Sequence, residues 1–413
     1  MSRPALRRCV SGDLARFADD VWSRRPQLST SAELVAYQPV SGFADLFSLA
    51  AVDELLSRRA LRTPFIRVAK RGAVVPPAHY TRSGGTGALV ADQVADDRVL
   101  ALFAGGHTIV LQGLHRTWPP LADFAGQLAT DLGHPVQVNA YITPAQSQGF
   151  AAHYDVHDVF VLQVAGEKRW LVHEPVLHDP LRTEPWEDRR DAVAARAAEQ
   201  PVADTVLRPG DSLYLPRGYL HSAEALGEVS CHLTVGVHPV TRQAVLDELV
   251  ALVRDDPALR TSLPLATDLA DADAVAHDVR ATVDAVAARL RRVQPGQVAE
   301  RLAHRLLDSN RPAAVPPLAT LAASESLRPE TPVTGRAHLR AVIEDGSAGG
   351  LVRLAGRAVE LPAGAVPAVR RLLAGEQLPA GALPGLPPEE SLELARRLVR
   401  EAVAVVSTGD GPA

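Results

Sequence analysis

The chain has 413 residues, a length that predicts two or three domains and permits a sizeable hydrophobic core. Hydrophobic residues make up 46% and charged residues 22%, which excludes disorder over most of the length, and no apolar run is long enough to cross a bilayer. The net charge of -5 argues against broad electrostatic binding to nucleic acids, and two cysteines, Cys9 and Cys231, are too few for a disulfide framework or a cysteine-rich zinc site.

Residues 1–60 are expected to be mostly helical, residues 61–115 to be mixed with two short strands, and a further helix is expected to follow. Apolar residues at helical spacing predict the helices, and short apolar runs predict the strands. The expected helices cover residues 13–22, 41–57 and 119–132, and the expected strands cover residues 64–69 and 106–112. Charged residues interrupt the first 20 positions, unlike a secretion signal, so we expect a cytoplasmic protein.

Residues 136–238 have the pattern of a β domain. The expected strands cover residues 136–142, 158–165, 169–172, 212–215 and 229–237. Gly166-Glu167-Lys168 is expected to join two of them as a hairpin, and Pro216-Arg217-Gly218 is expected to form a turn. Many short strands separated by turns predict a barrel or a sandwich. A charged, helical insertion over residues 182–200 interrupts this region, and the sequence does not indicate its role.

The remainder of the chain is expected to be helical and then mixed. Helices are expected over residues 242–253, 270–293 and 296–308, a linker over 312–317, a helix or strand over 337–343, a hairpin over 351–361 around Gly356, and helices over 363–373 and 388–405. We therefore expect domains at 1–240, 241–325 and 326–413. From Pro329 to Ala413 there are nine arginines, no lysine and ten acidic residues, so no direct DNA binding is expected.

The segment with the clearest chemistry contains His153 and Asp155, spaced as H-x-D. On a strand, residues two apart project to the same face, so an imidazole and a carboxylate can meet one metal ion. His221, which follows a strand and a Pro-Arg-Gly turn, is a candidate third ligand. Two histidines and one carboxylate on one octahedral face are the ligand set of non-haem Fe(II) oxygenases, and they leave positions open for a keto acid and dioxygen.

Other interpretations of these residues stay open at this point. The same ligand set also suits zinc, which favours tetrahedral closure. His157 is a rival for His153, although its position relative to Asp155 is less suitable. Asp158 and Glu224 could orient the ligands through hydrogen bonds, and His232 is expected to line the site rather than to bind metal.

Lys168 is the second chemical feature, because the chain has only two lysines, Lys70 and Lys168. An inward-pointing ammonium near the metal would bind the distal carboxylate of 2-oxoglutarate by a charge-assisted hydrogen bond. The alternative is an exposed hairpin lysine. Asn139, Tyr141 and Thr234 lie on the polar faces of alternating strands and would line the same cavity, the alternative being a solvated sheet face.

The sequence around these residues resembles that of the ribosomal oxygenases, which are JmjC-type members of the cupin superfamily. The resemblance rests on QGFAAHYD (148–155), FVLQVAGEKRW (160–170) and PGDSLYLPRGYLHSA (209–223) and covers residues 30–240 best. It implies a mainly β catalytic core, the double-stranded β-helix, over residues 1–240 with helical N-terminal elements. It also implies a helical dimerisation domain over 241–325 and a small α+β, winged-helix-like domain over 326–413.

The resemblance further implies that His153, Asp155 and His221 bind Fe(II) and that Lys168 binds 2-oxoglutarate. We therefore expect a 2-oxoglutarate-dependent dioxygenase that hydroxylates a protein side chain, namely an arginine or histidine of a ribosomal protein. Two alternatives stay open. The same chemistry could act on a peptide natural product or a small molecule, or the chain could be a non-catalytic cupin-fold binding protein. A homodimer without membrane association is expected.

Overall fold

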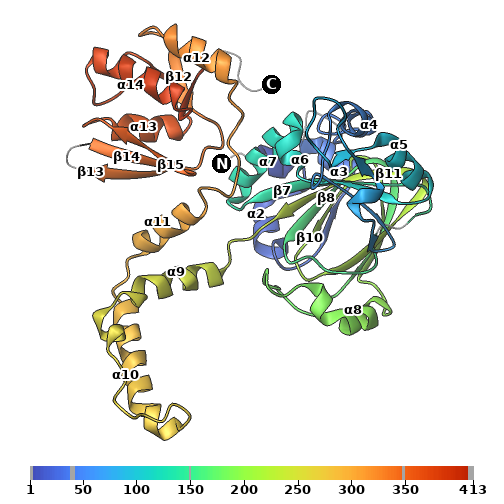
Figure 1. The fold of residues 1–413 in the computed structure, drawn as a ribbon, viewed down its shortest axis with the longest axis horizontal. Helices are drawn as coiled ribbons and strands as arrows, with labels where there is room; N and C mark the ends of the chain where they lie inside the picture. Colours follow the sequence, from blue (N-terminus) through green and yellow to red (C-terminus); the bar gives the residue numbers. More distant parts are fainter. Residues whose placement is uncertain (1–2, 38–41, 148–149, 347–348, 408–413) are drawn as a thin grey trace. The chain divides into compact units, whose positions relative to one another are not determined.

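The computed structural model describes residues 3–37, 42–147, 150–346 and 349–407. The chain divides into two compact units, Met1–Pro239 and Val240–Ala413 (Figure 1). Among the described residues, every helix is too short or too polar to span a membrane.

Unit 1 is built on an antiparallel sheet of nine strands, in the order β1-β10-β8-β11-β7-β6-β2-β3, with β9 also paired to β8. These strands are β1 (Gln27–Ser29), β2 (Ile66–Lys70), β3 (Ala73–Val74), β6 (Thr108–Leu111), β7 (Val136–Thr143), β8 (Asp158–His173), β9 (Ala203–Leu207), β10 (Ser212–Leu215) and β11 (Leu220–Val237). A separate ribbon pairs β4 (Thr81–Arg82) with β5 (Gln93–Val94). Alternation along β7 buries Val138 and Ala140, which places its polar residues on the opposite face.

The helices of unit 1 are α1 (Pro4–Arg7), α2 (Leu14–Arg16), α3 (Ser31–Leu34), α4 (Leu49–Arg58), α5 (Asp96–Ala104), α6 (Leu114–Thr117), α7 (Pro119–Leu132) and α8 (Arg190–Ala197). The first seven pack apolar side chains into a common core with β7 and β11. Helix α8 instead buries Val193 in a separate cluster with Tyr154 and Leu220. The predicted helix 119–132 is confirmed to the residue.

The prediction of a helix over 41–57 is partly wrong, because α4 begins only at Leu49. Ser48 caps its N-terminus by accepting a hydrogen bond from the backbone amide of Ala51. The residues just before it form turns that bury Phe43 and Phe47 in the core, and Ser41 lies outside the described residues.

The expected hairpin at 166–168 is also wrong. Strand β8 runs without interruption from Asp158 to His173 and pairs along its length with β11, with register shifts between Leu226 and Cys231 and between Cys231 and His232. The ladder contains a bulge at this point, and Gly166 has a positive φ of 62°. A glycine followed by two charged residues suggested a turn, whereas here it lets a long strand bend.

We expect Gly166→Ala to lower the free energy of unfolding by about 1–3 kcal/mol, because an L side chain is strained at this φ. The added methyl group would also press on the carbonyl oxygen of Val229. Urea titration followed by circular dichroism measures the change. Gly227→Ala is the matched control, because Gly227 also has a positive φ but has open space around it; equal losses for both variants would contradict the steric explanation.

Unit 2 begins with helices and ends in a small mixed fold. The helices are α9 (Arg242–Arg254), α10 (Ala272–Leu290), α11 (Pro295–Arg305), α12 (Pro317–Glu325), α13 (Val366–Leu373) and α14 (Pro388–Arg400). Strands β13 (Val342–Gly346), β14 (Gly349–Leu354) and β15 (Arg357–Leu361) form one sheet, and β12 (Pro332–Gly335), β16 (Leu378–Pro379) and β17 (Ala404–Val406) form another. The hairpin around Gly356 is confirmed, and the ambiguous segment 337–343 leads into strand β13.

Candidate metal centre

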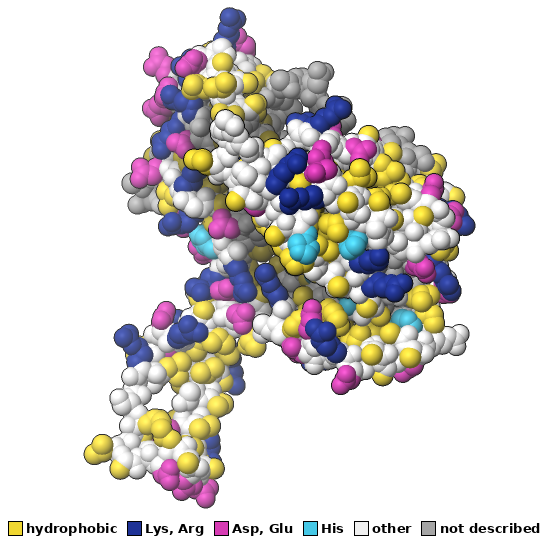
Figure 2. Space-filling view, turned by 45° about the vertical axis from the view of Figure 1, so that its right-hand side comes forward, with side chains coloured by type: hydrophobic (Ala, Val, Ile, Leu, Met, Phe, Trp, Pro, Cys, Tyr) yellow, Lys and Arg dark blue, Asp and Glu magenta, His cyan; other side chains and the backbone are white. Residues whose placement is uncertain are grey.

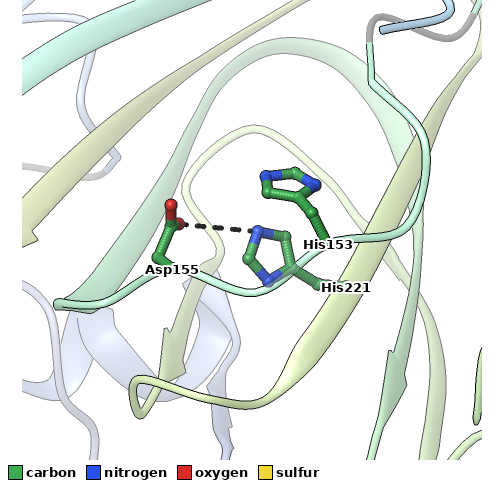
Figure 3. A group of neighbouring side chains, drawn as sticks. All are labelled: His153, Asp155 and His221. Carbon is green, nitrogen blue, oxygen red and sulfur yellow. Dashed lines mark ion pairs between the residues drawn. The ribbon is translucent and has the colours of Figure 1, made fainter. Parts of the chain in front are cut away.

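His153, Asp155 and His221 converge in unit 1, and Figure 3 shows their side chains turned toward one another. One ligand atom from each residue lies within 4.8 Å of the other two, a spacing that one metal ion can bridge. The Nε2 atom of His221 lies 3.7 Å from a carboxylate oxygen of Asp155, and the two imidazole centroids are 4.5 Å apart. The sequence therefore predicted a set of residues that the fold brings together.

Backbone contacts hold the three residues in place. The amide of His153 donates to the carbonyl of His221 at 3.2 Å, and the amide of His221 donates back at 2.8 Å. The amide of Gly218, in the turn before β11, donates to the carbonyl of Asp155. His153 and Asp155 thus lie in a loop joined to β11 by an isolated bridge, and not on a regular strand as expected from H-x-D spacing.

In both imidazoles the Nδ1 atom lies within hydrogen-bond distance of a backbone carbonyl oxygen. Nδ1 of His153 lies 2.8 Å from the carbonyl of Ala151, and Nδ1 of His221 lies 3.2 Å from the carbonyl of Tyr219. A proton on Nδ1 leaves Nε2 with a free lone pair for a metal. Burial lowers the pKa of His221 to about 4, so its imidazole is neutral at pH 7.

Asp155 completes the centre as an anionic donor. Burial acts to raise the pKa of its carboxyl, but the neighbouring imidazoles of His157, His221 and His153 outweigh burial and hold the pKa below its usual value. A carboxylate oxygen and two imidazole nitrogens are hard and intermediate donors, which suit Fe(II), Mn(II) or Zn(II). This donor set fits the metal expected from the sequence.

Asp158 holds the turn before His221 and, within the described part of the chain, makes no hydrogen bond to the three converging residues themselves. Its buried carboxylate accepts hydrogen bonds from the hydroxyl of Tyr214 at 3.0 Å and the amide of Arg217 at 2.9 Å. Glu224 is exposed on β11, so it does not share that role. His157 is not part of the converging set, and its Nε2 lies 3.2 Å from the side-chain nitrogen of Gln137.

Lys168 is only 4% exposed, so it is not the surface lysine of the alternative interpretation. Its ammonium donates to the hydroxyl of Thr143 at 3.0 Å, and that hydroxyl is also bonded to Thr108. Within the described part of the chain, no carboxylate forms an ion pair with it, and burial lowers its pKa to about 7. A buried ammonium without a counter-ion is costly, and an anionic ligand would remove that cost.

Lys168 and the three converging residues line the same cavity, which has a volume of about 650 Å³. Tyr141, Thr234 and His232 also line it, and the ring of Tyr141 stacks on that of His232 with a centroid distance of 5.1 Å. Asn139 is not among the lining residues. Its side-chain oxygen instead accepts a hydrogen bond from the amide of Gly113 at 3.0 Å, which ties β7 to the start of α6.

The sequence interpretation missed several lining residues. Thr143 continues the same alternation on β7 as Tyr141, so this alternation could have identified it. Trp186, Glu187 and Arg190 come from the insertion 182–200 and also line the cavity. Nothing in their spacing indicated this, because Trp186 and Glu187 lie in a single 3-10 turn (Trp186–Arg189) that is too short to show a periodicity.

Comparison with known families matches residues 121–245 to the JmjC domain. The chain contains a JmjC domain. This match spans β7, β8, β10 and β11 and all three converging residues. The JmjC/cupin fold expected from the sequence is confirmed.

Proteins named ribosomal oxygenases are among the relatives of this JmjC chain, so the resemblance seen in the sequence is confirmed. Ribosomal oxygenase 2 of Rattus norvegicus is 39% identical over 140 residues, 32% of this chain and 29% of that protein. Ribosomal oxygenase 1 of Homo sapiens is 29% identical over 255 residues, 57% of this chain and 36% of that protein. The chain thus matches about a third of the length of these relatives.

Solved structures extend the likeness beyond the JmjC domain. Escherichia coli YcfD, described as a ribosomal oxygenase, aligns over 96% of this chain and 98% of its own, with a TM-score of 0.55 and 16% identity. A YcfD complex with cobalt and 2-oxoglutarate aligns with a TM-score of 0.54 at 15% identity. At these identities the likeness concerns the fold alone.

Proposed function

We propose that this protein is an Fe(II)- and 2-oxoglutarate-dependent oxygenase that hydroxylates a side chain of a protein. One observation carries the proposal. A two-histidine, one-carboxylate cluster and a buried ammonium without a carboxylate partner among the described residues line one cavity. The cluster suits a metal with open coordination positions, and the ammonium suits the far carboxylate of a dicarboxylic keto acid.

The roles of individual residues follow from their contacts. His153, Asp155 and His221 would hold Fe(II), which in this class of enzyme supplies oxidation by dioxygen coupled to decarboxylation of the keto acid. Lys168 and Thr143 would bind the distal carboxylate, and Tyr141 and Thr234 would line its path. The buried walls of the cavity would exclude water from the reacting centre.

The names of the relatives support a ribosomal protein as substrate. Two groups of relatives are called ribosomal oxygenases, and the Drosophila erecta relative is called a bifunctional lysine-specific demethylase and histidyl-hydroxylase. We propose a histidine or arginine of a ribosomal protein as the hydroxylated residue, in the cytoplasm. Cys9 and Cys231 are both free and buried, as suits a reducing compartment.

The direct test supplies the purified protein with Fe(II), ascorbate and 2-oxoglutarate, and measures succinate. Mass spectrometry of ribosomal proteins from a deletion strain then looks for the loss of a single-oxygen addition. Succinate formation with an unchanged ribosomal pattern would favour a peptide natural product or small molecule as substrate. Failure to bind iron under anaerobic loading would contradict the enzyme and favour a non-catalytic cupin-fold protein.

We also propose that residues 241–325 form a homodimer and that 326–413 is a winged-helix-like domain. No residue of helix α10 is buried, and Val279 and Val283 are 54% and 59% exposed on it. Figure 2 shows hydrophobic side chains gathered on this helical segment. Burial of such a stripe against a second copy would stabilise the protein.

If so, Val283→Asp is expected to weaken dimerisation at least about tenfold, because it places a charge within the apolar contact. Light scattering after size-exclusion chromatography over a range of concentrations measures this. Asp284→Ala, at the next position of α10, is the control. A wild-type protein that is monomeric at all concentrations would contradict the dimer.

A further inference from the structure

The outer part of the cavity is built from two segments that contribute positive charge. Arg67 lies on β2 and Arg71 lies in the turn after it, whereas Arg190 begins α8 in the insertion 182–200. All three line the cavity together with one acidic residue of the insertion, Glu187. Arg71, Glu187 and Arg190 are exposed, so this region meets solvent.

Two aromatic rings lie next to the candidate metal centre, and the guanidinium group of one of these arginines lies over each ring. The ring centroids of Phe150 and Trp186 lie 6.1 and 6.3 Å from that of His153. The guanidinium of Arg67 lies 5.3 Å from the centroid of Phe150, and that of Arg190 lies 5.1 Å from the centroid of Trp186. Stacking holds each guanidinium group against the face of the ring. The N–H groups at the edge of the guanidinium then stay free to donate hydrogen bonds to a ligand.

The three arginines have no ion-pair partner among the residues that the structure describes, whereas many other arginines of the chain have one, such as Arg62 with Asp92. The Nε atom of Arg67 is buried and makes no hydrogen bond. Three arginines that form no ion pair with a described residue, together with one carboxylate, therefore line the approach to the candidate metal centre. Such an arrangement attracts carboxylates and repels cationic segments.

We propose that this arginine–aromatic clamp, made of Arg67, Arg71, Phe150, Trp186 and Arg190, selects substrate segments with an acidic residue next to the oxidised residue. The inference rests on the proposed function and adds the local chemistry of the substrate. The rings flank the residue that enters the cavity, and the guanidinium groups bind the neighbouring carboxylate. The insertion 182–200 thereby acquires a role in specificity.

An acidic peptide fits this clamp better than a nucleic acid does. Glu187 lines the same region, so the positive charge is interrupted and does not form a continuous track for a polyanion. The cavity of about 650 Å³ also admits a side chain with its flanking backbone but not a folded nucleic-acid strand. Charge complementarity therefore favours one or two carboxylates at fixed positions.

The test uses the full chain and two fluorescein-labelled peptides of 13 residues, read by fluorescence anisotropy at low and physiological salt. Both peptides have a central histidine and neutral flanks, and they differ only in carrying either Asp or Lys on each side of it. We expect the Asp peptide to bind at least about fivefold more tightly, with a smaller difference at higher salt. Arg190→Glu should reduce or reverse this preference, Arg190→Lys should retain most of it, and Arg58→Glu, an equal charge change on α4, should leave it unchanged.

Two results would overturn the clamp: equal binding of both peptides to the wild-type protein, or a preference that survives Arg190→Glu. A single-stranded oligouridylate that binds more tightly than the Asp peptide and loses affinity in Arg190→Glu would also overturn it, in favour of a nucleic-acid contact. Binding of Mn(II) and N-oxalylglycine is followed separately by the electron paramagnetic resonance of Mn(II). Failure there contradicts the proposed function, whereas the anisotropy of unloaded protein still tests the clamp.

Discussion

Succinate formation is expected to fall to background, more than about a hundredfold, when His153 is replaced by alanine. Loss of a group that merely orients a metal ligand costs tenfold to a hundredfold, and His153 would bind the metal itself. The variant removes one of three donors and leaves the other two within reach of water. Coupled assay of succinate from Fe(II), ascorbate and 2-oxoglutarate measures the rate, and metal content is measured in parallel.

His79→Ala is the matched control, because His79 is exposed in a short 3-10 turn and does not line the cavity. It should form succinate at the wild-type rate. Equal activity of His153→Ala and the parent protein would refute the role of His153 as a metal ligand.

The second large effect concerns Lys168 and the uptake of a proton. Its pKa of about 7 means that at pH 8 roughly 90% of the free protein has a neutral amine at this position. A bound carboxylate raises that pKa again, so binding of 2-oxoglutarate to the Mn(II)-loaded protein should take up about 0.9 proton at pH 8. Calorimetric titrations in buffers of different ionisation enthalpy measure this number.

Two variants separate the charge of Lys168 from its position. Lys168→Arg keeps a permanent cation, so any remaining binding should proceed without proton uptake. Lys168→Met removes the cation and should weaken 2-oxoglutarate binding about 10- to 100-fold, the usual cost of losing a hydrogen bond to a charged group. Proton uptake by Lys168→Met equal to that of the wild type would show that another group titrates.

The lowered pKa of Lys168 also determines how the free energy of unfolding depends on pH when no cosubstrate is bound. In the unfolded chain the lysine takes its ordinary pKa of 10.5, whereas in the folded protein burial lowers this pKa to about 7. Between these values the unfolded state binds more protons, so Lys168 increasingly favours folding as the pH rises from about 7 to about 10. Below pH 7 both states are protonated, and the cost of burying the charge is fully present.

The convergence of His153, Asp155 and His221 could be predicted from the sequence because these residues occur in short, ordered motifs. H-x-D, the Pro-Arg-Gly turn and the distal histidine suggested which side chains meet, although the loop geometry of His153 differed from the assumed strand. The continuous strand β8 was missed because a bulge and a hairpin use the same residues, glycine followed by polar positions. Only pairing with β11, which is remote in sequence, distinguishes the two.

Residues whose role depends on tertiary contacts were harder to predict. Asn139 has the correct alternation on β7 but contacts the backbone of Gly113, which the pattern of β7 does not reveal. Trp186 reaches the cavity from an insertion whose residues show no apolar period. The start of α4 was predicted too early because the residues before Ser48 form turns, yet their apolar side chains are buried in the core like those of a helix.

The pairing of β8 with β11 fixes the backbone positions of the metal-ligand candidate His221 and of Lys168. In that ladder Val172 lies opposite His221 and Lys168 lies opposite Ala225, so the two backbone positions are four residues apart, about 13 Å along the strands. The two side chains span the rest of the distance to a bound ligand. The ladder therefore sets the length of keto diacid that can reach both groups, and oxaloacetate, one carbon shorter than 2-oxoglutarate, is expected to bind more weakly.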